Sequence, residues 1–180
     1  MGEIKSSIEI ALERAAAMGG GDEQELLQAE AEKKGKLLAR RLLGGDLDLE
    51  GLAREMAGLE DKALPFARRA AAQVLLEGMA DNPQASLLGI RDLAQAAGAQ
   101  EQALAVLSAA EAIHSAAAEL EEELAREMAQ DLAREGISGP ALVPNPQAHP
   151  QYDQRMEQAL GQASQELARA GERLLAALGG

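Results

Sequence analysis

The amino-acid sequence predicts an all-α protein, and three observations lead to this expectation. Residues that favour helices, namely Ala, Leu, Glu, Gln and Arg, dominate the 180-residue chain. β-Branched residues are scarce, and threonine is absent. Apolar residues make up 47% of the chain and recur at spacings of three and four, the period of one helix face, whereas no stretch alternates with the period of a strand.

Glycine runs divide the start of the chain into two expected helices. The first runs from about Glu3 to Met18, and Gly19–Gly21 ends it because glycine readily adopts the left-handed conformation. Asp22 then caps a second helix, whose buried face includes Gly35, a place where another backbone can approach closely. Gly44–Gly45 ends this second helix.

Three shorter helices are expected next, each opened by a side chain that can cap it. The expected caps are, in order, Asp46 or Asp48, Asp61 and Asn82. Pro65 and Pro83 are tolerated because they fall in or near the first turn of their helices. The first of these helices ends near Gly58 and the last near Gly98.

The chain is therefore expected to have two parts. Residues 1–98 form an N-terminal helical body, and residues 99–180 form two long helices joined by a proline-rich connector at 136–150. The long helices fold back as a coiled-coil-like hairpin or bundle. An arrangement in which both parts form one continuous domain stays open.

Both long helices, about Glu101–Glu135 and Gln151–Leu178, carry apolar residues at heptad-like spacings. The first helix is expected to end at Gly136. The candidate partner interface consists of the apolar residues of both helices, here called the seam: Val106, Ala110, Ile113, Ala117, Leu120, Leu124, Met128, Leu132, Met156, Leu160, Ala163, Leu167, Ala170 and Leu174. The seam closes either within one chain or between two chains, and the pattern leaves both open.

Composition excludes several classes of function. Without cysteine there is no disulfide framework and no thiolate chemistry. A net charge of −13 with one Phe and one Tyr argues against nucleic-acid binding, which needs a basic surface and stacking rings. Since no nucleophile elbow and no phosphate loop occurs, we expect no enzyme, no catalytic residue and no cofactor.

Two motifs resemble metal sites but are incomplete. Glu111 and His114 match one Glu-x-x-His pair of a di-iron bundle, and a full centre needs a second pair. Asp46, Asp48 and Glu50 imitate the start of a calcium loop, but Ala57 stands where the closing glutamate should be. No metal is expected, although a bundle that takes its second Glu/His set from a partner chain stays as an alternative.

Charged residues are clustered unevenly along the chain. The basic cluster is Lys33, Lys34, Lys36, Arg40 and Arg41. It is expected to pair with Glu30 and Glu32 on a solvated face, with a docking patch for an acidic partner as the alternative. The long helix at 101–135 is strongly acidic and should repel nucleic acid and anionic lipid.

The sequence predicts a soluble, cytoplasmic protein. Charges at Glu3, Lys5 and Glu9 interrupt any signal-peptide core. The least polar stretch, 103–118, contains Glu111 and falls short of the ~20 residues of a spanning helix, so no membrane span is expected. Met1–Ser6 fits the loose acylation pattern, but a single acyl chain anchors weakly.

The segment EIKSSIEIALER, residues 3–14, resembles the opening of a family of short, uncharacterised bacterial proteins. That resemblance implies a bacterial cytosolic setting and no site residues. In composition and heptads the chain is also similar to phasins, the Ala-rich granule-coat proteins, and to stalk subunits of rotary ATPases.

The expected function is that of a non-enzymatic helical interaction protein, an adaptor or assembly factor. Its partner is another protein or a second copy of the chain, as a homo-oligomer such as a dimer. Two alternatives stay open, namely the metal- or ligand-binding bundle using Glu111 and His114, and a phasin-like amphipathic coat protein.

Overall fold

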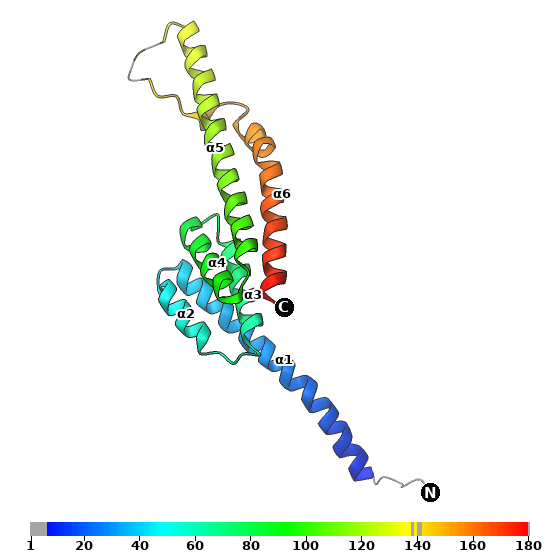
Figure 1. The fold of residues 1–180 in the computed structure, drawn as a ribbon. Helices are drawn as coiled ribbons and strands as arrows, with labels where there is room; N and C mark the ends of the chain where they lie inside the picture. The colour runs from blue at the N-terminus through cyan, green and yellow to red at the C-terminus, as the bar shows by residue number, and fades with distance from the viewer. Residues whose placement is uncertain (1–6, 138, 140–141, 180) are drawn as a thin grey trace. The chain divides into compact units, whose positions relative to one another are not determined.

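A computed structural model describes the backbone of residues 7–137, 139 and 142–179, and the side chains from Gln24 onward within these ranges. The described residues form six α-helices and a short 3-10 turn, with no strand, so the all-α prediction is confirmed (Figure 1). The expected start of the first helix at residues 3–6, the acylation pattern and the resemblance segment's opening lie outside the described residues.

The chain divides into two compact units, one of Met1–Ala99 with Leu175–Gly180 and one of Gln100–Leu174. The first division therefore falls beside the expected boundary at residue 98. The last residues of the final helix belong to the first unit, whereas the sequence pattern groups them with the long helices. Each unit is described by itself below.

Helix α1 spans Ser7–Leu43 without interruption. The expected break at Gly19–Gly21 and the Asp22 cap are therefore wrong, and Asp22 lies inside the helix. An interior glycine costs only about 1 kcal/mol relative to alanine, and good helix formers flank the run. The expected end at Gly44–Gly45 is confirmed, with Gly45 at a φ of +78°.

Helix α1 packs mainly on α3, which spans Leu64–Glu77. Gly35 makes this packing close, because a Cβ atom at this position would overlap the carbonyl oxygen of Ala67 in α3. The expected close approach of another backbone at Gly35 is confirmed.

The short helices confirm two of the three expected caps. Helix α2, Leu49–Ala57, begins after Asp48, whose carboxylate accepts a hydrogen bond of 2.7 Å from the Gly51 N–H. Helix α4, Pro83–Ala97, begins after Asn82, whose side chain accepts a hydrogen bond of 3.2 Å from the Ala85 N–H. Gly98 follows the helix at its C-terminal end.

The expected Asp61 cap of α3 is wrong. The N-cap position is Ala63, which offers no side-chain acceptor. Instead the backbone carbonyl of Glu60 accepts from the Ala63 and Leu64 N–H groups, so a turn leads into the helix. Pro65 lies in the first turn, as expected.

The core of the first unit consists of aliphatic side chains from the helices α1, α2, α3 and α4. Its fully buried members include Leu38 of α1, Leu52 of α2, Leu75 of α3 and Ile90 of α4. Alanines of α3 such as Ala67 and Ala71 are also fully buried, and Ala67 lies where the backbones of α1 and α3 approach closely. Among the residues that the structure describes, no aromatic side chain belongs to this buried core.

The second unit contains α5, Gln100–Arg134, the 3-10 turn η1, Pro146–Ala148, and most of α6, Tyr152–Leu178. Helix α5 ends as expected at Gly136, at a φ of +82°, where the Ile137 N–H donates back to the Leu132 carbonyl at 2.9 Å. The connector returns along α5 through η1, and α6 runs antiparallel beside α5 (Figure 1).

Candidate interaction surface

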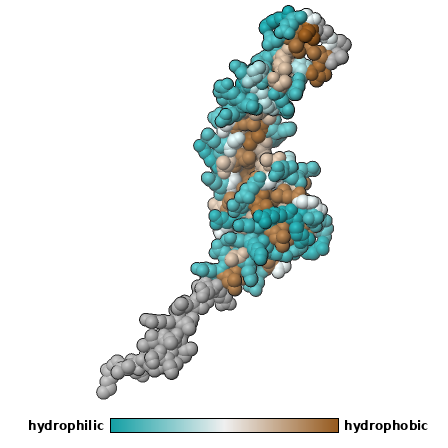
Figure 2. Space-filling view, turned by 180° about the vertical axis from the view of Figure 1, so that it is seen from behind, coloured by the Kyte–Doolittle hydropathy of each residue, from teal (hydrophilic) through white to brown (hydrophobic). Residues whose placement is uncertain are grey.

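The predicted seam residues share one property in the structure, since none of them is exposed. Val106, Leu120 and Leu124 of α5 and Ala170 and Leu174 of α6 are buried. The others are half-buried: Ala110, Ile113, Ala117, Met128, Leu132, Met156, Leu160, Ala163 and Leu167. On the long helices, apolar surface gathers in patches between hydrophilic areas (Figure 2).

Ion pairs hold the beginning of α6 against the acidic part of α5. The Arg155 guanidinium lies 2.7 Å from a Glu127 carboxylate oxygen and 3.0 Å from one of Glu123. The hydrogen bond from Arg155 lowers the pKa of Glu127. The Tyr152 hydroxyl donates to Glu121 at 2.9 Å. These contacts order a stretch where the acids of α5 would otherwise repel one another.

His149 of the connector joins this cluster. Its Nδ1 accepts a hydrogen bond of 3.1 Å from the Gln151 N–H. Nε2 lies 3.8 Å from Glu127. The imidazole thus lies beside the Arg155–Glu127 pair.

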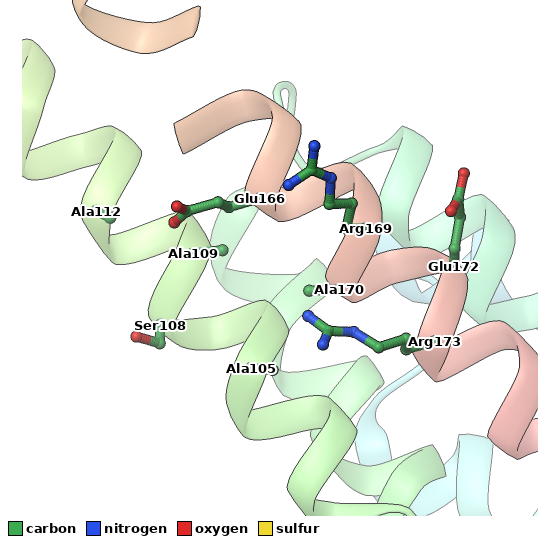
Figure 3. A pocket seen from close by; sticks show the side chains of 9 residues that line it. All are labelled: Ala105, Ser108, Ala109, Ala112, Glu166, Arg169, Ala170, Glu172 and Arg173. Carbon is green, nitrogen blue, oxygen red and sulfur yellow. The ribbon is translucent and has the colours of Figure 1, made fainter. Parts of the chain in front are cut away.

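Between α5 and α6 lies a groove of about 720 Å³ (Figure 3). Its floor consists of small residues, namely Ala105, Ala109 and Ala112 of α5 and Ala170 of α6, with Ser108 at the edge. The rim on α6 carries four charged side chains, here called the charged rim: Glu166, Arg169, Glu172 and Arg173. The groove thus combines an apolar, shallow floor with charges of both signs.

The charged rim is exposed to solvent. Among the residues whose side chains are described, none of its four members forms an ion pair. Glu166 and Arg173 extend from α6 toward α5, with Ala170 between them (Figure 3). The apolar heptad pattern did not predict this rim, and no other signal in the sequence marks it.

Glu111 and His114 are both exposed on α5. In the part of the chain that the structure describes, no three His, Asp or Glu side chains come together in a group that could hold a metal ion. His149, the second histidine, lies in the connector and faces Glu127 instead. The structure therefore brings no further ligands to the predicted half-site.

The other charged motifs have local partners. Asp48 caps α2, and Glu50 pairs with Arg54 at 2.9 Å. In the basic cluster, Lys34 and Arg41 both bind Glu55 of α2, with the Arg41 contact at 2.7 Å. These hydrogen bonds lower the pKa of Glu55. Part of the cluster thus ties α1 to α2, a role that sequence reasoning missed.

Helix α5 is the one helix in the described residues that is long and apolar enough to meet the length and composition criterion for crossing a membrane. Only 22% of the qualifying stretch is buried inside the protein. The core helix of a soluble protein can meet the same criterion, so the absence of a membrane span stays a prediction.

The fold and the surface together place the chain in the class of all-α proteins. Between its two antiparallel long helices lies a groove that is bordered by the charged rim. Comparisons with protein-family models, curated proteins and solved structures find no significant match to this chain.

Proposed function

We propose that this chain is a non-enzymatic, cytoplasmic helical interaction protein, an adaptor or assembly factor that binds a protein partner through α5 and α6. The observation that carries the proposal is the half-buried seam. Ile113, Leu160 and Leu167 lie on two long helices, and the chain itself covers each of them only in part.

A partner would gain free energy by covering this seam. Burying apolar surface contributes ~25 cal/mol per Å², so completing the burial of one such aliphatic side chain contributes about 1 kcal/mol. Several of them along one face add up to a useful binding energy. Shorter side chains between them, such as Ala117 and Ala163, allow a partner helix to come close.

Electrostatics restrict the partner's chemistry. The acids Glu119, Glu122 and Glu123 are exposed on α5, and the whole chain carries a net charge of −13. Such a surface repels nucleic acid and anionic lipid. A protein surface with apolar residues and some basic ones fits best.

Photo-crosslinking tests this proposal. A photoreactive residue replaces Ile113 or Leu160 of the seam in the full chain, and the exposed Gln158 serves as the matched control on α6. After irradiation in cells of the source organism, we expect protein adducts at both seam positions and few at the control. Mass spectrometry then identifies the adduct as another protein or as a second copy.

Crosslinks that form only within a single polypeptide at both seam positions, and join no other molecule, would contradict the proposal. They would mean that the seam is an internal core, which stays half-buried because two helices alone cannot cover it completely. Equal labelling at Gln158 would mean that the seam has no preference for a partner.

A second candidate, the phasin-like coat protein, is favoured by one specific observation. The apolar stretch of α5 is mostly unburied, and its Leu104 is 65% exposed. A coat protein would bind neutral-lipid droplets at low salt and lose that binding when Leu104 is replaced by Glu. An adaptor would stay in the aqueous phase when the droplets are floated by centrifugation.

A further inference from the structure

We infer that the groove between α5 and α6 binds a second copy of this chain, with the two α6 helices antiparallel about a two-fold axis near Ala170. The inference rests on the proposed function and names its partner. It follows from the shape of the groove and from the order of charges on its rim.

The groove offers room that this chain does not fill. Its floor is made of alanine side chains from both helices, and about 720 Å³ lies above them. A small-residue floor lets another helix approach closely, as it does where Gly35 meets Ala67 in the first unit. The side chains of an incoming helix would occupy this space.

The charged rim is complementary to itself. Read along α6, its charges are negative, positive, negative and positive at 166, 169, 172 and 173. When two such helices run antiparallel and cross at Ala170, Glu166 comes opposite Arg173 of the second copy, and Arg169 comes opposite Glu172. Both pairs are centred within half a residue of Ala170, so one axis serves both.

The positions around the helix agree with this pairing. At about 100° per residue, Glu166 and Arg173 lie within about 20° of each other on α6, and Arg169 and Glu172 lie about 60° apart from each other and farther around the helix from Ala170. A two-fold axis perpendicular to the helix pair keeps each residue on its own side. Each acid therefore meets the base that belongs to it.

Figure 3 shows which of the charged side chains are directed toward α5. Glu166 and Arg173 extend toward α5 over the groove (Figure 3). The two pairs that they form with the second copy would lie over the alanine floor, partly shielded from water, where ion pairs are screened less by salt. A two-fold interface uses the same patch on both copies and needs such self-complementarity.

Paired charge reversal tests the inference on the full chain. One variant carries Arg169→Glu and Arg173→Glu, and a second carries Glu166→Arg and Glu172→Arg. In each variant alone, all the charges that meet across the axis have the same sign. We expect the wild type to dimerise in sedimentation equilibrium and each variant alone to associate at least about tenfold more weakly.

An equimolar mixture of the two variants is expected to form a heterodimer, because every acid then meets a base. The control variant, Asp153→Arg with Glu157→Arg, makes the same change in net charge on α6 as Glu166→Arg with Glu172→Arg, but outside the charged rim, and should dimerise like the wild type. Circular dichroism checks that each variant keeps the helical content of the wild type.

A wild type that stays monomeric throughout the concentration series overturns the inference, and so does a mixture that forms no heterodimer. Adducts to another protein at Ile113 or Leu160 would still support the proposed function in that case. Conversely, self-adducts with no effect of charge reversal would place the self-contact on a different face.

Discussion

At the scale of single residues, Gly35 shows how one missing side chain determines a helix contact. The backbones of α1 and α3 approach so closely that a Cβ atom would overlap the Ala67 carbonyl oxygen. The obstacle is backbone and not the end of a flexible side chain, so α3 as a whole would have to move.

We therefore expect Gly35→Ala to lower the free energy of unfolding by about 2 kcal/mol or more. Gly161 is the matched control, because it lies inside α6 and a Cβ atom there meets nothing within 4 Å. Gly161→Ala should raise the stability by up to about 1 kcal/mol, from helix propensity alone. Urea unfolding followed by circular dichroism measures both, and equal effects in the two variants would refute the steric explanation.

The basic cluster shows that helical spacing does not predict contacts between helices. Its five residues were expected to pair along their own helix with Glu30 and Glu32, but Lys34 and Arg41 bind Glu55 on α2. Helical spacing shows which residues share a face of one helix. It does not show which other helix faces them, because that depends on tertiary packing.

At the scale of elements, the join between the connector and α6 is held by polar side chains. Tyr152 donates to Glu121, and Arg155 bridges Glu123 and Glu127. The hydrogen bond to Glu121 raises the pKa of Tyr152 above its ordinary value of 10.0, and burial raises it further. Ionised Tyr152 would place a second negative charge beside a carboxylate.

Tyr152 is the only tyrosine, and the chain has no tryptophan, so an absorbance titration reports this phenol alone. We expect its pKa in the folded protein to exceed 10.0 and to fall back toward that value in Glu121→Gln. Because the folded pKa is raised, the stabilisation is present below the unfolded pKa and is lost as the pH rises through the folded one.

The chain unfolded in urea gives the reference value for this titration. If the folded wild type titrates together with the unfolded chain, the contact between Tyr152 and Glu121 is absent in solution. An unchanged pKa in Glu121→Gln, with the wild type still raised, would assign the shift to burial instead.

Element boundaries were largely predictable because their signals are local. The caps at Asp48 and Asn82 and the ends at Gly45 and Gly136 depend on backbone geometry within a few residues. The break expected at Gly19–Gly21 failed because glycine permits a helix end without requiring one. Asp61 failed as a cap because a backbone carbonyl took its place.

At the scale of the whole molecule, composition predicted the fold class but not the candidate site. Helix formers and apolar periodicity suffice for an all-α chain. The burial of the seam residues follows the heptad spacing within each helix, whereas their role as a partner interface stays a prediction. The charged rim was not predicted, since acids and bases on a helix surface look alike in sequence whether they face solvent or line a groove.

The contact at Gly35 also has a consequence for the alignment of the two helices along their axes. A slip of α1 by about one turn would bring Ala31 or Ala39, both buried on the same face, to the point where only hydrogen fits. Either methyl group would strike α3. The two helices can separate but cannot slide past each other. Packings of α1 on α3 that are shifted by a turn are therefore sterically excluded while the first unit folds, and Gly35 alone determines the correct alignment.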